Sequence, residues 1–273
     1  MERIIKGINR LFHGNKRQML TAIALLLIVY VLLLAGIFSY FHSEDTVTNR
    51  LAAKNGSVAI QEPNWDNTGK FDAKSSEPGM KISKNPMGYN DGQIYLYIRL
   101  KMTIELDSLT QAEKDLKTKE YKDNYLTADN DIRRLKTIAE NIKYVSADNA
   151  EPFIELDTTD ADVRNWSITD CSNSYFVFDA ANQSVDNDKL VFYFYYSNGQ
   201  KDSEGHDLMC RVAPNELTKE LFHRVDIPEY KKDYLGVFDL PYKIIVQAEG
   251  IPVESAASML VDNAKAEFEY YER

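Results

Sequence analysis

The segment 19–41 contains no charged residue, and it sets the strongest limit on what this chain can fold into. About 20 consecutive apolar residues make a helix long enough to span a bilayer, and a helix satisfies its own backbone hydrogen bonds there. Lys16 and Arg17 precede the segment, and two acidic residues follow it closely. Because positive flanks stay on the cytoplasmic side, we expect an N-terminal hydrophobic helix with the rest of the chain facing outward.

Residues 1–39 have two interpretations, a signal peptide that is removed and an anchor that is kept. An ordinary signal peptide has a shorter apolar core and an A-x-A-like cleavage site. Here the core is long, and the small residues Ala35, Gly36 and Ser39 come late. Length alone favours an anchor in the membrane. In both cases residues 40–273 form the exported part.

The exported part is acidic. The whole chain carries a net charge of −10, and its first 39 residues hold five basic residues and one acidic residue, so residues 40–273 carry about −14. Binding to nucleic acid needs Lys and Arg gathered on one face. We therefore expect no nucleic-acid partner.

Residues 94–106 give the strongest strand signal. Apolar residues occupy every second position from Ile94 to Leu106. This alternation predicts an antiparallel strand with one face in a core and a polar or aromatic face opposite. Further strands are expected at 143–156, 173–179, 189–196, 222–227 and 242–249. Many short strands separated by turns predict a mainly β protein, with a β-sandwich as the leading architecture.

Two helical patterns accompany the strands. An apolar stripe from Ile132 to Ile142 recurs at helical spacing and predicts a helical insertion at about 107–142. A terminal helix is expected from Ser255, with Val261 and Phe268 on its apolar face. No low-complexity linker divides residues 40–273, so we expect one outer domain.

The sequence contains no motif for catalysis or metal binding. The four histidines, His13, His42, His206 and His223, form no H-E-x-x-H, and neither a G-x-S-x-G nor a P-loop is present. Cys210 lies four residues from His206, but we favour a structural role for this cysteine over a nucleophilic one. We expect no enzyme activity, no metal and no cofactor.

Three further groups of residues each have a functional and a structural interpretation. Cys171 and Cys210 could form a disulfide outside the membrane or remain buried thiols. The carboxylates within 157–162 lack the EF-hand pattern, which favours a solvated loop over a calcium site. Trp65 and Trp166 could stack on sugars, but we favour packing at a sheet edge.

Several short motifs occur in an order that resembles one family. They are Gly36 to Phe41 at the end of the apolar segment, Val47 to Ile60 behind it, Glu62-Pro-Asn-Trp-Asp66, the Pro-Gly turn from Glu77 to Pro86, the strand from Asn90 to Met102, the segment Leu217 to Pro228, and the closing Ile244 to Ala264. Together they resemble the TasA/BsaA-like matrix proteins of Gram-positive cells, which depend on a SipW-type signal peptidase and include camelysin-like sequences. The region 107–165 is not covered by the resemblance.

The resemblance implies a jelly-roll-like sandwich that assembles into extracellular fibres. Aligned on Phe41, the signal would be cut between Ser39 and Tyr40, although Ser39 stands where the family prefers Ala. In relatives the freed N-terminal segment can complete a neighbour's sheet as a donated strand. The donor-strand candidates here are Val47, Leu51, Val58 and Ile60. The alternative is that they form an ordinary first strand of their own domain.

The expected function is therefore an exported, self-assembling subunit of the biofilm matrix or cell surface, whose partners are further copies of itself and the SipW-type signal peptidase. An alternative is a membrane-anchored extracellular domain for binding or adhesion. A camelysin-like metalloprotease comes third, because no zinc motif supports it.

Overall fold

The computed structural model of the chain describes residues 56–74, 77, 79–107, 128–146, 149–157, 167–185, 189–227, 242–254 and 258–272. None of the helices within these residues is long and apolar enough to cross a membrane. The predicted hydrophobic helix, the cleavage site at Ser39 and Tyr40, and the donor candidates Val47 and Leu51 lie outside the described residues.

The described chain is mainly β. Its strands are β1 (Val58–Gln61), β2 (Lys81–Ser83), β3 (Met87–Asn90), β4 (Leu96–Leu106), β5 (Ile142–Ser146), β6 (Asn149–Pro152), β7 (Ile154–Asp157), β8 (Ser167–Cys171), β9 (Phe176–Phe178), β10 (Ser184–Val185), β11 (Lys189–Tyr196), β12 (Arg211–Val212), β13 (Arg224–Asp226) and β14 (Tyr242–Pro252). Its helical segments are η1 (Trp65–Gly69), α3 (Lys70–Lys74), α6 (Ala128–Glu140), η2 (Ala180–Asn182) and α7 (Val261–Glu272).

Strand β4 is the centre of the largest sheet. It pairs with β14 along one edge over its full length, and with β11 and then β12 along the other. Strands β9 and β10 pair with the far edge of β11. Every ladder among the described strands is antiparallel, as expected for short strands joined by turns.

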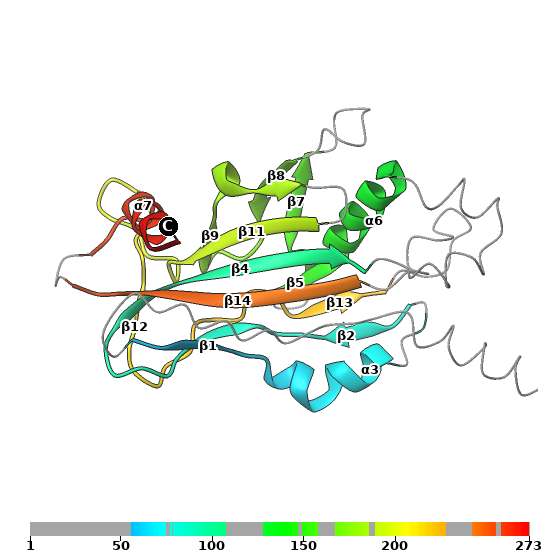
Figure 1. Cartoon of the computed structure of the whole chain (residues 1–273), viewed down its shortest axis with the longest axis horizontal. Helices are drawn as coiled ribbons and strands as arrows, with labels where there is room; N and C mark the ends of the chain where they lie inside the picture. Colours follow the sequence, from blue (N-terminus) through cyan, green and yellow to red (C-terminus); the bar gives the residue numbers. More distant parts are fainter. Residues whose placement is uncertain are drawn as a thin grey trace, which may run out of the picture. The chain divides into compact units, whose positions relative to one another are not determined.

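A second layer is formed by β1, β2, β3, β13, β5 and β6. Strand β1 pairs with β3, and the order β2-β13-β5-β6 completes the layer. Backbone bonds between the strands extend the pairing, so that chain 79–90 runs antiparallel to chain 215–227. Figure 1 shows β1 and β2 below β4 and β14, with α7 on the opposite side of β4.

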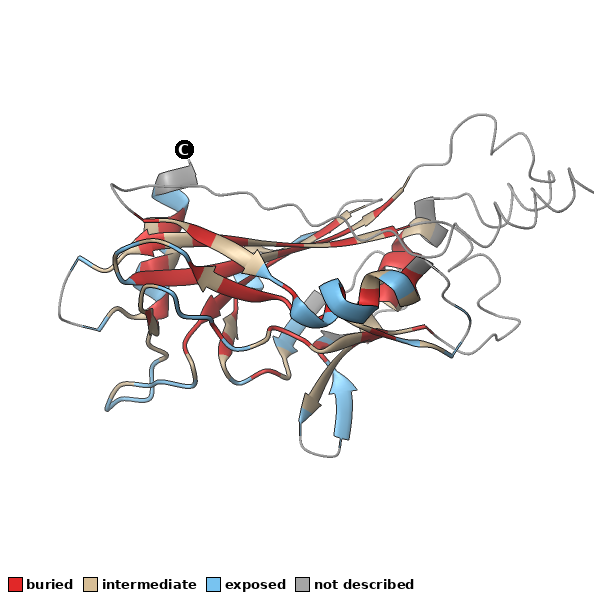
Figure 2. Ribbon diagram, turned by 90° about the horizontal axis from the view of Figure 1, so that it is seen from below, coloured by how far each residue is buried: buried red, intermediate tan, exposed pale blue. Residues whose placement is uncertain are grey.

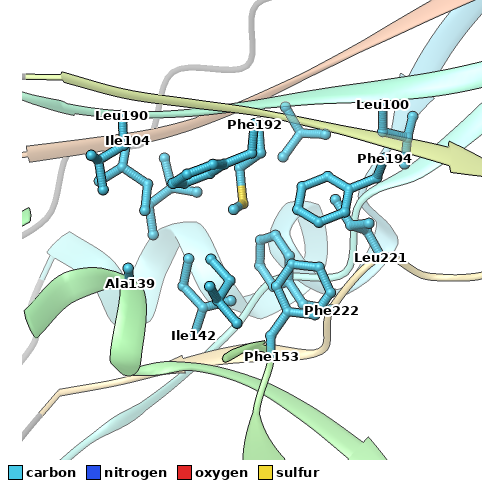
Figure 3. Packing of buried hydrophobic residues seen from close by; sticks show 14 of the residues in the cluster. Leu100, Ile104, Ala139, Ile142, Phe153, Leu190, Phe192, Phe194, Leu221 and Phe222 are labelled. Atoms are coloured by element: carbon cyan, nitrogen blue, oxygen red, sulfur yellow. The ribbon is translucent and has the colours of Figure 1, made fainter. Parts of the chain in front are cut away.

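The main core lies between the two layers. In Figure 3, Leu100 and Ile104 of β4 and the phenylalanines of β11 point toward Ile142, Phe153 and Phe222. The ring centroid of Phe153 lies 5.2 Å from that of Phe194 and 5.7 Å from that of Phe222. Burying each such side chain contributes about 1.5–3 kcal/mol. In Figure 2, buried residues run along the long strands, whereas strand β6 is exposed throughout.

Most of the second face of β4 is also buried, which differs from the expected half-buried strand. Tyr97 and Arg99 are 1% and 0% exposed, although they belong to the polar and aromatic face. Helix α7 covers this region with Val261, Ala264 and Phe268, which form a second apolar cluster with residues of β4 and β11. The alternating pattern is correct for β4, but α7 covers its polar face around Tyr97 and Arg99.

Arg99 is held by an ion pair and by aromatic rings. Its Nε lies 2.6 Å from Oε2 of Glu249 on β14, and its Nη1 donates to the Tyr195 hydroxyl at 3.2 Å. The guanidinium carbon lies 4.6 Å from the ring centroids of both Tyr193 and Phe268. Burial raises the pKa of Tyr195 to about 12, so this hydroxyl stays protonated at neutral pH. Arg99 can be buried because its charge is paired with a carboxylate and its flat guanidinium group stacks on aromatic rings.

The structure confirms a mainly β, antiparallel fold with a C-terminal helix, and it corrects several boundaries. The expected strand at 143–156 is three strands, β5 to β7. Ile142 begins β5 and does not belong to the helix of the insertion, which in the described part is α6. The C-terminal helix begins at Val261. The strand expected at 189–196 matches β11. The jelly-roll arrangement stays a prediction.

The buried hydroxyls of Tyr97 and Tyr195 lead to opposite predictions. The Tyr97 hydroxyl makes no hydrogen bond among the described residues, so Tyr97→Phe should leave the free energy of unfolding unchanged or raise it by up to ~1 kcal/mol. Tyr195→Phe removes an acceptor for a charged donor and should lower it by ~1.5–3 kcal/mol. Urea denaturation measures both. Equal losses in the two variants would contradict this assignment.

Candidate functional site

A buried ion pair fixes the chain immediately after β1. Nζ of Lys84, between β2 and β3, lies 2.6 Å from Oε2 of Glu62. Both side chains are almost fully buried, and the Lys84 ammonium also lies 4.7 Å from the ring centroid of Trp65. We call Glu62, Trp65 and Lys84 the N-terminal clasp. It joins two of the motifs that carry the family resemblance.

The local sequence places these three residues together. Glu62 directly follows β1, and the backbone N–H of Asp66 donates to the carbonyl oxygen of Glu62 at 2.9 Å, which begins a helical turn. The turn brings Trp65 back over the layer, where it is 4% exposed. Trp65 is therefore a packing residue, and its predicted alternative of stacking on a sugar is not supported by this burial.

A line of hydrogen bonds runs from Asn64, beside the clasp, to His223. The backbone N–H of Asn64 donates to Oδ1 of Asn85 at 2.8 Å, and Nδ2 of Asn85 donates to Oε1 of Glu220 at 2.9 Å. Oε2 of Glu220 lies 2.9 Å from Nε2 of His223. Nδ1 of His223 accepts from the backbone N–H of Val145 at 3.0 Å, so in this arrangement Nε2 carries the proton and donates to Glu220.

Beside this line lies an open pocket of about 450 Å³. Its walls come from β3, from β5, from the turn before β9 and from the chain that leads into β13, and they consist of Met87, Tyr144, Tyr175, Leu217, Thr218, Lys219, Glu220 and His223. Proteins bind small molecules and parts of larger ones in concave sites of this size. We treat the pocket as the candidate functional site.

Hydrogen bonds fix several of these walls in place. Nδ2 of Asn173 donates to the carbonyl oxygens of Glu220 and Leu221, and its Oδ1 accepts from the backbone N–H of Tyr175. Thr218 Oγ1 accepts from the backbone N–H of Gly88 at 2.9 Å. Asn173 therefore joins one aromatic wall to the segment that carries the charged wall.

The charges of the pocket are one carboxylate and one ammonium. The hydrogen bond from His223 lowers the pKa of Glu220, as does the bond from Asn85, so Glu220 is charged at neutral pH. Nζ of Lys219 lies 5.7 Å from the ring centroid of Tyr175. Burial raises the pKa of Tyr144, whose ring centroid lies 4.8 Å from that of His223. With His223 bonded as described, the lining is close to neutral overall.

The cysteines are free thiols in this structure. Cys171 Sγ lies near the carbonyl oxygens of Asn173 and Phe176, and burial raises the pKa of its thiol to about 12. Burial also raises the pKa of Cys210. Neither is an activated nucleophile, since the thiolate is the reactive form. The disulfide stays a prediction.

The remaining predicted residues are placed as follows. Val58 and Ile60 lie in β1, which pairs with β3 of its own domain. His206 is exposed and contacts Asp202, whereas Cys210 contacts Gln200 and Arg211, so no described contact joins the cysteine to the histidine. In the described part of the chain no cluster of His, Cys, Asp and Glu could hold a metal ion. Trp166 and most of 157–162 lie outside that part.

The sequence alone did not reveal the pocket or the contacts within the clasp. Tyr144, Tyr175 and Glu220 come from three separate stretches of the chain, and no local pattern links them. Glu62, Trp65 and Lys84 all lie within the motifs of the family resemblance, yet the order of the motifs alone does not indicate that these residues touch. Comparison of the chain with models of known protein families and with curated proteins gives no match. The family resemblance therefore stays a prediction.

The clasp should contribute strongly to stability. Lys84→Met leaves the Glu62 carboxylate buried without its cation, so we expect the free energy of unfolding to fall by ~3–5 kcal/mol. Adding Glu62→Gln to Lys84→Met removes the stranded charge and should recover part of this loss. Urea denaturation of the two single variants and the double variant measures the coupling. Strictly additive losses would show that the pair is not coupled.

Proposed function

We propose that this chain is an exported structural protein, a non-catalytic subunit that assembles with further copies of itself in the extracellular matrix or at the cell surface. Three features support the proposal: an uncharged segment 19–41 behind a basic flank, an acidic body, and the ordered motifs. A jelly-roll-like sandwich is the finer architecture that the proposal assumes, and the two facing layers are consistent with it.

The main observation that supports assembly is the outer edge of β1. In an antiparallel strand, the N–H and C=O of successive residues point alternately to the two neighbours. Asn90 exchanges backbone bonds with Glu216 and Asn215, and the carbonyl of Gly88 accepts from Thr218. The backbone groups of Asn90 and Gly88 thus face chain 215–218, whereas those of Tyr89 and Met87 face β1.

The register of β1 against β3 then shows to which side the backbone groups of each β1 residue point. Ala59 is opposite Tyr89 and Gln61 is opposite Met87, so these two residues form the ladder to β3. The backbone groups of Val58 and Ile60 point to the outer edge, where no described strand pairs with them. An unpaired edge is a template for a further strand.

The proposed joint therefore assigns different roles to the donor-strand candidates. Val58 and Ile60 belong to the accepting edge, with Val58 buried beside Gly250. Residues before β1, including Val47 and Leu51, would supply the strand donated to the next copy. The N-terminal clasp marks the limit of exchange, because the chain from Glu62 onward is fixed to its own body. Such a contact is heterologous and generates an open polymer.

Export and release predict the N-terminus of the secreted protein. We expect Edman degradation or mass spectrometry of secreted material to find Tyr40 as the first residue. Cleavage would free the segment before β1 to move away from the membrane. A protein that retains residues 1–39 in the membrane fraction would contradict release and would support an anchored domain.

Ile60→Pro should block assembly without unfolding the protein. Proline removes the N–H of residue 60, which faces outward, and an edge strand tolerates proline there. Ile60→Ala is the matched control, because it removes the same side chain but keeps the N–H. In wild type and Ile60→Ala we expect detergent-resistant ladders and filaments by electron microscopy. Ile60→Pro should stay monomeric while melting close to Ile60→Ala.

Two outcomes would contradict this joint. One is assembly of Ile60→Pro at the wild-type rate, and the other is a strictly monomeric wild-type protein at high concentration. Ala59→Pro serves as a contrast, because it removes a bond of the ladder to β3 and should destabilise the fold itself.

A further inference from the structure

We infer that the pocket between β5, the turn before β9 and the chain entering β13 binds a neutral sugar ring, as part of a polysaccharide. The inference goes beyond the proposed assembly and rests on different residues. The accepting edge involves β1, whereas this pocket is formed by Tyr144, Tyr175, Lys219 and Glu220 together with their neighbours.

The pocket offers the two kinds of surface that a sugar ring requires. Tyr144, Tyr175 and the apolar side chains of Met87 and Leu217 provide ring faces and hydrocarbon for the C–H side of a pyranose. Lys219 provides a donor and Glu220 an acceptor on the same lining. A pyranose has an apolar face and a rim of hydroxyl groups, and each hydroxyl both donates and accepts.

The pairing of charges favours a neutral ligand over a charged one. A cationic ligand would be attracted by Glu220 but repelled by Lys219. An anionic ligand would be attracted by Lys219 but repelled by Glu220. A neutral polyol can donate to the carboxylate and accept from the ammonium at once. Glu220 retains this capacity, because each of its oxygens uses one acceptor position for Asn85 or His223 and keeps another.

The acceptor is also fixed before any ligand arrives. Asn85 and His223 hold the two carboxylate oxygens, and Asn173 holds the backbone carbonyl of the same residue. A group that is already oriented loses little conformational freedom on binding. Side-chain exposures of 32% for Glu220 and 28% for His223 keep the rim accessible to a polymer.

The test uses defined sugars on the purified mature chain. The probes are glucose, N-acetylglucosamine and the β-1,4-linked tetramer of each, measured by saturation-transfer NMR and by calorimetry. Methylammonium and acetate serve as the charged comparison ligands. We expect at least one tetramer to bind in the millimolar range or tighter, with neither charged ligand competing.

Two variants place the binding in this pocket. Lys219 is exposed, so Lys219→Met should fold normally and weaken tetramer binding about tenfold. Tyr175→Ala removes an aromatic wall and should weaken it by a similar factor. Lys201→Met is the matched control, because Lys201 is an exposed lysine outside the pocket that pairs with Asp207. Thermal melting checks that all three variants are folded.

The inference is overturned if no probe binds to wild type, if both pocket variants bind as tightly as Lys201→Met, or if a charged ligand displaces the sugar. Ile60→Pro separates this result from the assembly proposal. That variant should lose assembly and keep the wild-type affinity for the tetramer, so each proposal can fail without the other.

Discussion

Strand β4 imposes the constraint on which the rest of the structure depends. It has a partner along both edges; the second layer covers one of its faces, and α7 covers the other face around Tyr97 and Arg99. A strand that carries a charged side chain on one face can be covered on both faces only if that charge finds partners. Arg99 meets this requirement through Glu249, Tyr195 and two flanking rings. The position of α7 therefore depends on a charge that is neutralised within the sheet.

Strand β1 of the second layer also depends on contacts beyond its own backbone ladder. β1 is short and has one described ladder, so backbone pairing alone holds it weakly. The clasp adds a buried ion pair directly after it, and the hydrogen bond from Asn64 to Asn85 adds a second attachment. The same layer carries the pocket. The proposed accepting edge of β1 and the pocket proposed to bind a sugar thus belong to one layer and use separate residues.

Much of the fold followed from local patterns in the sequence. The alternation in 94–106 and the aromatic run in 189–196 gave strands that the structure confirms, because each contains enough periodic side chains to fix its face. The split of 143–156 was signalled by Asp148, Asn149 and Pro152, which favour turns and strand ends. The burial of Arg99 could not be predicted, since it depends on a helix more than 150 residues further along the chain. The pocket could not be predicted either, because its walls come from stretches that lie far apart in the sequence.

The two hydrogen bonds of the Asn85 amide fix the direction in which this group points. Its amide oxygen accepts from the Asn64 backbone, while its amide nitrogen donates to Glu220, so the two ends of one flat group serve opposite needs. Aspartate has the same outline but no hydrogen to donate, and it would set a second negative charge against the carboxylate of Glu220. Leucine would fill the space and leave both neighbours without their bonds. The amide therefore acts as a polarised joint with one permitted orientation, and a half-turn about its last bond would turn both contacts from attraction to repulsion.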